Sequence, residues 1–303
     1  MSGSSEIWSR RRALKAAALG ALALAAGPAW ASSRGPSRLR LLKVRHSTFL
    51  LELDDTRALV DPCFSRGLGF GPLFDAAPPS LLPEDVGALD LLLVTSSRPD
   101  HFDPRGVRRL ARRDAFCMAP DEDVAKRLRS AGFSRVRVVA PGDVFELRGV
   151  KVEVSPSEDG LGLAPQVGYR LSRRGRSVWH MGAPPPVEVF ADTAAFARQH
   201  PSEVVLACWD GTRALGRRLS MGAADGELLA ALAKARFAIP QHDGGPPGLL
   251  GALLLERGPA RREPLPQGPR VFVVEPGVWY RVASTSVRRG RRASAPPRRE
   301  GPP

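Results

Sequence analysis

Short apolar runs, each bounded by turn-forming residues, follow one another along most of the chain from position 39 onward. Such runs predict β-strands, which we expect at 39–45, 48–53, 57–61, 90–95, 115–118, 135–139, 144–147, 150–154, 166–172, 177–182, 203–208, 237–239, 271–274 and 279–282. Helical spacing of apolar residues predicts helices at about 104–113, 121–132, 188–199 and 220–236. Strands with helices spaced between them predict an α/β sandwich of two sheets covered by helices.

The first 31 residues have the pattern of an export signal. Ser9 to Lys15 (SRRRALK) resembles the twin-arginine consensus, and a weakly apolar stretch, 16–26, follows it. Small residues at Ala29 and Ala31 predict cleavage after Ala31. We therefore expect export by the twin-arginine route to the periplasm or the extracellular space, with no integral membrane segment left after cleavage. The alternative is an uncleaved anchor, for which the apolar stretch is short.

Composition divides the rest of the chain into two parts. Residues 32–287 are long enough for one globular domain, and residues 63–88 within it form a Gly- and Pro-rich loop of the kind that often covers a site. Residues 288–303 are rich in Arg, Pro, Gly, Ser and Ala, a composition that predicts a disordered tail.

The net charge says less about binding partners than its size suggests. The formal charge is +14, of which the first 31 residues carry +3 and the last 16 carry +5, leaving +6 for residues 32–287. Aromatic residues make up 6% of the chain, whereas a nucleic-acid interface needs a basic stripe with aromatics among it. We expect no nucleic-acid partner. The Arg-rich surface and tail are open to two interpretations, a polyanion-binding surface and a solvated extension.

Two of the five histidines follow apolar strands, where α/β proteins gather functional side chains. His101 comes directly after the strand at 90–95 and its turn, and His242 follows the strand at 237–239. Asp100 stands beside His101, and a carboxylate next to an imidazole is a suitable ligand pair for a transition metal. The same pair is also common as a structural hydrogen-bonding pair.

The order of the segments resembles the metallo-β-lactamase superfamily, most of all its L-ascorbate-6-phosphate lactonase-like and N-acyl-phosphatidylethanolamine phospholipase D-like branch. The matching segments are 46–52, 58–62, 91–103, 131–156, 177–184, 221–242 and 271–277. The resemblance implies a four-layer αββα sandwich over residues 32–287. It also implies a metal site built on the family's Thr-His-x-His-x-Asp-His motif, which falls at 95–101.

The sequence departs from that motif in a pattern. Positions at which the family keeps ligands of the first metal, or the bridging Asp, hold Ser96, Arg98, Asp159 and Ala183. The family's ligands for the second metal are all kept, at Asp100, His101 and His242. A carboxylate and two imidazoles suffice for one zinc ion with an open position for water. The resemblance therefore implies one zinc site, with the other site lost.

Other residues receive roles from the same resemblance. Arg98 is a permanent cation suited to hold an anionic substrate group or a developing oxyanion. Asp159 or Glu158 is the candidate general base. His46 is expected to face the substrate, and Asp61 is expected to organise the metal site without binding the ion.

These residues support two hypotheses. The first is an exported hydrolase that cleaves an ester, a lactone or a phosphodiester of a small-molecule or lipid-like substrate. The second is a non-catalytic relative that has lost the metal centre and binds a ligand or partner in the cell envelope.

Overall fold

The structure is a computed structural model that describes residues 37–65, 78–157, 165–183, 191–209, 211–214, 217–218, 220–242, 255–256, 268–283 and 285–293. The expected export signal, and Glu158 and Asp159, lie outside these ranges. No helix in the described ranges has the length and apolar character needed to cross a membrane.

Two large sheets form the centre of the fold. In spatial order, the first consists of β18 (Val287–Arg292), β17 (Val278–Val282), β1 (Leu39–Arg45), β2 (Thr48–Leu53), β3 (Thr56–Val60), β4 (Leu91–Leu93), β5 (Phe116–Ala119) and β6 (Val136–Val138). The second consists of β16 (Arg270–Val271), β14 (Phe237–Gln241), β11 (Val204–Cys208), β10 (Arg176–His180), β9 (Val167–Arg173), β8 (Val150–Pro156) and β7 (Val144–Leu147).

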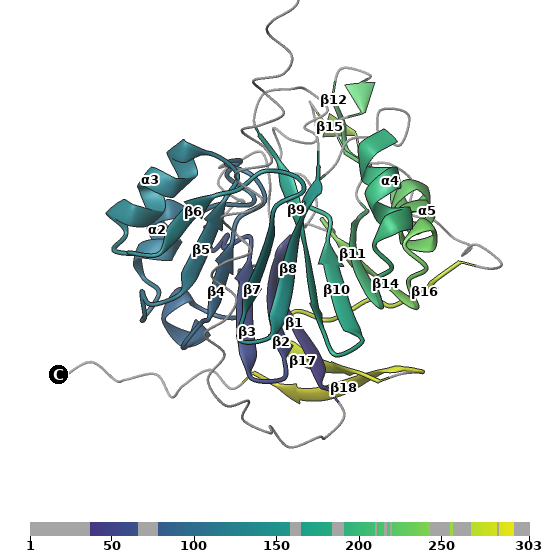
Figure 1. Ribbon diagram of the computed structural model, residues 1–303, viewed down its shortest axis with the longest axis horizontal. Helices are drawn as coiled ribbons and strands as arrows, with labels where there is room; N and C mark the ends of the chain where they lie inside the picture. The colour runs from purple at the N-terminus through teal and green to yellow at the C-terminus, as the bar shows by residue number, and fades with distance from the viewer. Residues whose placement is uncertain are drawn as a thin grey trace, which may run out of the picture. The chain divides into compact units, whose positions relative to one another are not determined.

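The helices lie on the outer faces of these sheets (Figure 1). They are α2 (Pro104–Arg108), α3 (Glu122–Ser130), α4 (Ala191–Gln199) and α5 (Ala223–Leu232), and a 3-10 helix spans Pro83–Val86. In Figure 1, α2 and α3 flank the first sheet and α4 and α5 flank the second. A small third sheet consists of β13 (Arg217–Arg218), β12 (Arg213–Ala214) and β15 (Leu255–Glu256).

Three apolar layers hold this arrangement together. The central layer joins the inner faces of the two sheets and includes Leu51, Val154 and Leu206. A second layer joins the first sheet to α3 through Leu128, and a third joins the second sheet to α5 through Leu229. Burial of apolar surface on both faces of each sheet confirms the predicted four-layer αββα sandwich.

Polar contacts also cross between the sheets near one edge. The Tyr169 hydroxyl of β9 donates to the Val94 carbonyl at 2.8 Å, and the Lys43 ammonium of β1 donates to the Pro240 carbonyl of β14 at 3.1 Å. Both side chains are buried, so each contact satisfies a group that would otherwise be costly to bury. These bonds fix the ends of the two sheets against each other.

The predicted disordered tail is wrong for its first residues. Residues 287–292 form β18, antiparallel to β17, with Val287 paired to Val282. The Arg289 side chain pairs with Glu275 at 2.8 Å, and Gly290 packs so closely on Trp279 that an added Cβ would lie 2.9 Å from its carbonyl oxygen. An arginine-rich composition therefore does not prevent an edge strand, because its long side chains stay in solvent.

Several predicted boundaries also change. The strand expected at 271–274 is shorter and ends at Val271, and the helix expected at 104–113 ends at Arg108. The helix expected at 220–236 begins at Ala223 after Gly222, whose N–H donates to Asp225 at 3.1 Å. The third sheet had no signal in the sequence pattern, because its strands are two residues long.

Truncation tests the role of β18. We expect a chain that ends after Ser286 to lose roughly 1–3 kcal/mol of unfolding free energy, because the truncation removes the buried side chain of Val287 and the strand paired with β17. A chain that ends after Ala293 keeps β18 and is expected to match the full-length protein. Denaturant unfolding of both chains measures the difference, and equal stability of the two truncations would contradict it.

Candidate metal centre

The ends of strands from both sheets bring the candidate residues together. In the first sheet, His46 follows β1, Asp61 follows β3, and the motif loop 95–103 follows β4, which is parallel to β3. In the second sheet, His242 follows β14. Because parallel strands end at the same edge of a sheet, residues far apart in the sequence meet there.

The backbone at this edge is strained at three of the candidate residues. His46, Asp61 and His242 have φ angles of 38°, 49° and 56°, in the left-handed region that non-glycine residues seldom adopt. Each such residue costs of the order of 1 kcal/mol or more and tends to persist where function needs the side chain. These backbone conformations direct the three side chains toward the same edge of the sheets.

Asp61 holds the motif loop in place through hydrogen bonds. Its fully buried carboxylate accepts the Thr95 N–H at 2.8 Å, the Thr95 hydroxyl at 2.8 Å and the His101 Nδ1–H at 2.6 Å. The bond from Nδ1–H fixes the tautomer of His101, so the lone pair of its Nε2 faces away from Asp61. A carboxylate behind a histidine in this way is the usual partner of a metal-binding imidazole.

Imidazole nitrogens and one carboxylate converge in front of Asp61. Within the described part of the chain, the Nε2 atoms of His46, His101 and His242 are buried and have no hydrogen-bond partner. The Asp100 Oδ2 atom lies 3.4 Å from His46 Nε2 and 3.7 Å from His101 Nε2. Buried polar atoms are nearly always satisfied, so these nitrogens point to a ligand, and nitrogen with one carboxylate oxygen is a donor set that fits zinc.

Arg98 holds the same carboxylate from the other side. Its Nη2–H donates to Asp100 Oδ2 at 2.9 Å and its Nε–H donates to Oδ1 at 3.2 Å, a two-point ion pair. Burial raises the pKa of Asp100, but the Arg98 guanidinium, together with the imidazoles around the carboxylate, outweighs burial and holds that pKa well below its usual value. Asp100 is therefore a carboxylate, the form that binds a metal.

The imidazole of His242 is kept neutral. Its ring is buried beside two other rings, with centroids 4.1 Å from His46 and 4.8 Å from His101. Burial, with the neighbouring His46 and His101, holds the pKa of His242 well below its usual value. Neutral imidazole is the metal-binding form, so the site does not have to release a proton from this residue first.

The structure brings together most of the residues that the sequence singled out. Asp61, Arg98, Asp100, His101 and His242 form one contact group, and His46 joins it through Asp100. Asp159 and Glu158, the candidate bases, lie outside the described residues. Ser96, where the resemblance places a first-metal ligand, is fully buried and forms an isolated bridge with Gln166.

Sequence reasoning missed two residues that support the site. Thr95 links Asp61 to the motif through its backbone and its hydroxyl. Ser47 donates its hydroxyl to the Asp100 carbonyl at 3.1 Å and accepts from His180 Nε2 through its own carbonyl at 2.9 Å. Both are adjacent to residues with a predicted role, and that adjacency was the available signal.

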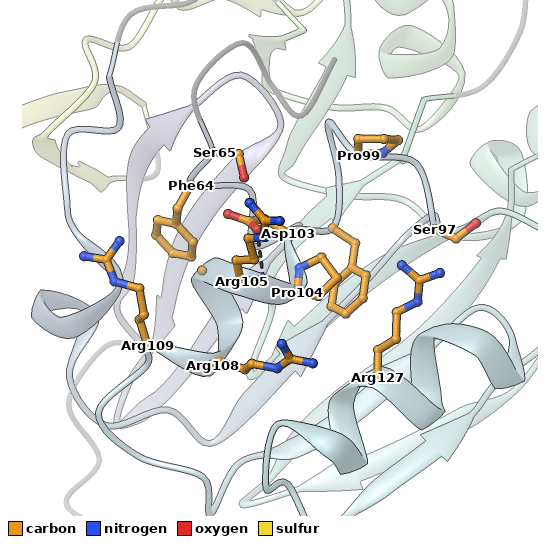
Figure 2. A pocket seen from close by; sticks show the side chains of 12 residues that line it. Phe64, Ser65, Ser97, Pro99, Asp103, Pro104, Arg105, Arg108, Arg109 and Arg127 are labelled. Atoms are coloured by element: carbon orange, nitrogen blue, oxygen red, sulfur yellow. Dashed lines mark hydrogen bonds between the residues drawn. The ribbon is translucent and has the colours of Figure 1, made fainter. Parts of the chain in front are cut away.

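A cavity of about 840 Å³ is lined in part by Ser97 and Pro99 of the motif loop. Figure 2 shows Arg127 extending from α3 toward Ser97 and Pro99 of that loop. The walls of the cavity combine aromatic and cationic residues, among them Phe64, Phe102, Arg105, Arg108 and Arg127. Asp100, His101 and His242 do not line it, so this cavity is a neighbour of the candidate metal centre and not the centre itself.

Comparison with known proteins agrees with this fold. The model of the family described as the beta-lactamase superfamily domain matches residues 40–242. A UPF0173 metal-dependent hydrolase of Methanopyrus kandleri is 25% identical over 255 residues, which cover 80% of this chain and 99% of the relative. These matches support a metallo-hydrolase of that superfamily.

Solved structures show the same fold at low identity. An isothiocyanate hydrolase from Delia radicum gut bacteria is 16% identical with a TM-score of 0.60, covering 79% of this chain and 98% of that one. The metallo hydrolase Igni18 of Ignicoccus hospitalis is 19% identical with a TM-score of 0.58, covering 81% and 99%. Both likenesses concern the fold.

Replacing Asp61 by Asn tests its organising role. The Thr95 N–H donates to Oδ1, whereas the Thr95 hydroxyl and the His101 Nδ1–H donate to Oδ2. An amide replaces one of these two oxygens by a donor, so we expect a loss of about 2–3 kcal/mol in unfolding free energy. The matched control is Asp55→Asn, at a residue whose side chain is 74% exposed, with an expected change under about 0.5 kcal/mol. Denaturant unfolding distinguishes them, and similar losses for both variants would refute the role of Asp61.

Proposed function

Because the chain belongs to the metallo-β-lactamase superfamily, we propose that it is a hydrolase that works with a single zinc ion held by Asp100, His101 and His242. The reaction is the hydrolysis of an ester, a lactone or a phosphodiester. The observation that carries the proposal is the convergence of buried, unpartnered histidine nitrogens on the Asp100 carboxylate. The relative from Methanopyrus kandleri, described as a metal-dependent hydrolase, supports the same reaction class.

The residues of the chain have separate tasks in this proposal. Asp61 holds the tautomer of His101 through Nδ1–H and leaves Nε2 available. Burial keeps His242 neutral, and Arg98 keeps Asp100 ionised. The ion, when bound, supplies Lewis acidity at neutral pH.

Substrate positioning and proton transfer are assigned to Arg98, to His46 and to the acidic pair Glu158 and Asp159. The Arg98 side chain is 29% exposed, so a substrate can reach the guanidinium while it remains bound to Asp100. Arg98 orients an anionic group or stabilises a developing oxyanion. Asp159 or Glu158 accepts the proton of the attacking water. His46 faces the substrate on the side of β1.

A second candidate function rests on the Arg98–Asp100 ion pair. Two-point contact with a guanidinium satisfies part of the carboxylate without a metal. Ser96 and Ala183 stand where the superfamily keeps a first-metal ligand and the bridging Asp. In this alternative the chain is a non-catalytic protein of the cell envelope that binds a ligand or partner.

Metal analysis decides between the two functions. We expect purified protein, after zinc loading and removal of free ion, to hold about one equivalent, and His242→Ala to hold less than about a tenth. Hydrolysis of a generic esterase or phosphodiesterase substrate is expected to follow the metal content in both proteins. His200→Ala is the control, because that ring stacks on Phe196 away from the centre.

Two results would remove one candidate each. Less than about a tenth of an equivalent in loaded wild-type protein would leave only the binding function. Hydrolysis that disappears in His242→Ala and persists in His200→Ala would exclude the non-catalytic function.

Export by the twin-arginine route is part of the proposal, supported by the sequence at Ser9 to Lys15. Replacing Arg10 and Arg11 together by Lys keeps the charge and removes the paired guanidinium groups that the consensus requires. We expect the variant to stay in the cytoplasm in cell fractionation, uncleaved after Ala31. Replacing Arg12 by Lys is the matched control and is expected to leave export unchanged; periplasmic recovery of the double variant would contradict this route.

A further inference from the structure

His46 has the environment of a metal ligand. The residue is 7% exposed, and neither of its ring nitrogens has a hydrogen-bond partner within the described residues. An imidazole taken out of water with neither nitrogen satisfied forfeits about 1–3 kcal/mol per unmet group. The Nε2 atom faces the Asp100 carboxylate at 3.4 Å without hydrogen-bond geometry, so packing alone does not explain the position of this ring.

Distances place His46 in one donor group with two of the predicted ligands, Asp100 and His242. The ligand atoms of His46, Asp100 and His242 all lie within 4.8 Å of one another. His46 Nε2 is 3.4 Å from Asp100 Oδ2, and two atoms about 2.1 Å from one tetrahedral ion are about 3.4 Å apart. The contact has the separation of two ligands that share an ion.

The backbone holds the ring there at a cost. His46 and Ser47 form the two-residue turn between β1 and β2, and a turn position with positive φ normally favours glycine or asparagine. The Ser47 hydroxyl and carbonyl, bound to the Asp100 backbone and to His180, anchor the turn against the motif loop. The hairpin therefore delivers an imidazole to the centre in a fixed position.

We propose that His46 is a direct ligand of the metal ion, so that the donor set is His46, Asp100, His101 and His242. The inference rests on the proposed single-metal function and changes its geometry. Three imidazoles and one carboxylate would hold the ion, water would join them as a fifth ligand during the reaction, and a ligand from the β1–β2 turn would compensate for those absent at Ser96, Arg98 and Ala183. The donor set then includes a residue that follows β1, and three nitrogen ligands favour zinc over magnesium or calcium.

Zinc affinity of His46→Gln tests the assignment. Gln is similar in size and polarity but is a poor zinc ligand, so we expect the dissociation constant, measured by chelator competition, to rise more than a hundredfold, beyond the effect of an outer hydrogen-bond partner. His242→Gln is expected to show a comparable rise, and His200→Gln, away from the centre, is expected to show none.

The wild-type protein offers a second readout that does not depend on a variant that folds. In protein with ¹⁵N-labelled histidine, zinc loading is expected to shift the ring nitrogen of His46 that coordinates, together with those of His101 and His242, and to leave His200 unchanged. A His46 ring that merely pairs with Asp100 would show no coordination shift.

The outcomes separate this inference from the function on which it rests. Zinc that binds wild type and His46→Gln equally, with no coordination shift at His46, overturns the ligand assignment and leaves the single-metal hydrolase standing. Loaded wild-type protein that retains no zinc overturns both, and His46 then only faces the Asp100 carboxylate.

Discussion

The buried carboxylate of Asp61 is the group around which the centre is arranged. A charge removed from water needs several donors to compensate its desolvation, and Asp61 takes them from Thr95 and His101. Those donors lie at the end of β4 and in the motif loop, so the loop has one low-energy position relative to β3. That position turns His101 toward Asp100 and leaves its Nε2 unpartnered within the described residues. The metal-binding geometry thus follows from satisfying one buried charge.

In the proposed single-metal centre, both the charge and the ligands differ from the two-metal arrangement that the resemblance to the superfamily implies. Ser96 and Ala183 are neutral and small, and Arg98 brings a permanent positive charge to Asp100. A guanidinium beside the remaining site keeps the carboxylate ionised where a second ion would otherwise do so. In this proposed centre the Arg98 ion pair therefore compensates the charge of Asp100 without a second metal ion.

Much of the fold and part of the site could be predicted from the sequence. Collinear segments and strand-end histidines indicated the superfamily and the sandwich, because strand runs and their order are local features. His46 was expected near the site, but its close contact with Asp100 and His242 was not predicted, since a positive φ in a two-residue turn and the approach of β1 to β14 depend on tertiary packing. The strand β18 was missed because arginine-rich composition is typical of disorder, whereas an edge strand needs only one paired side. Glu158 and Asp159 lie in a segment that the structure does not describe, so their roles stay predictions.

Strand β18 also affects how the protein interacts with other copies of itself. β18 ends the larger sheet, so its outer row of backbone groups has no neighbouring strand in the described parts of the chain. An open row of this kind can recruit a strand from another molecule and start aggregation. Arg288, Arg289, Arg291 and Arg292 are all exposed along it, and two such strands brought together would place eight cations in one ladder. Mutual repulsion between such strands opposes edge-to-edge pairing of two copies of this chain.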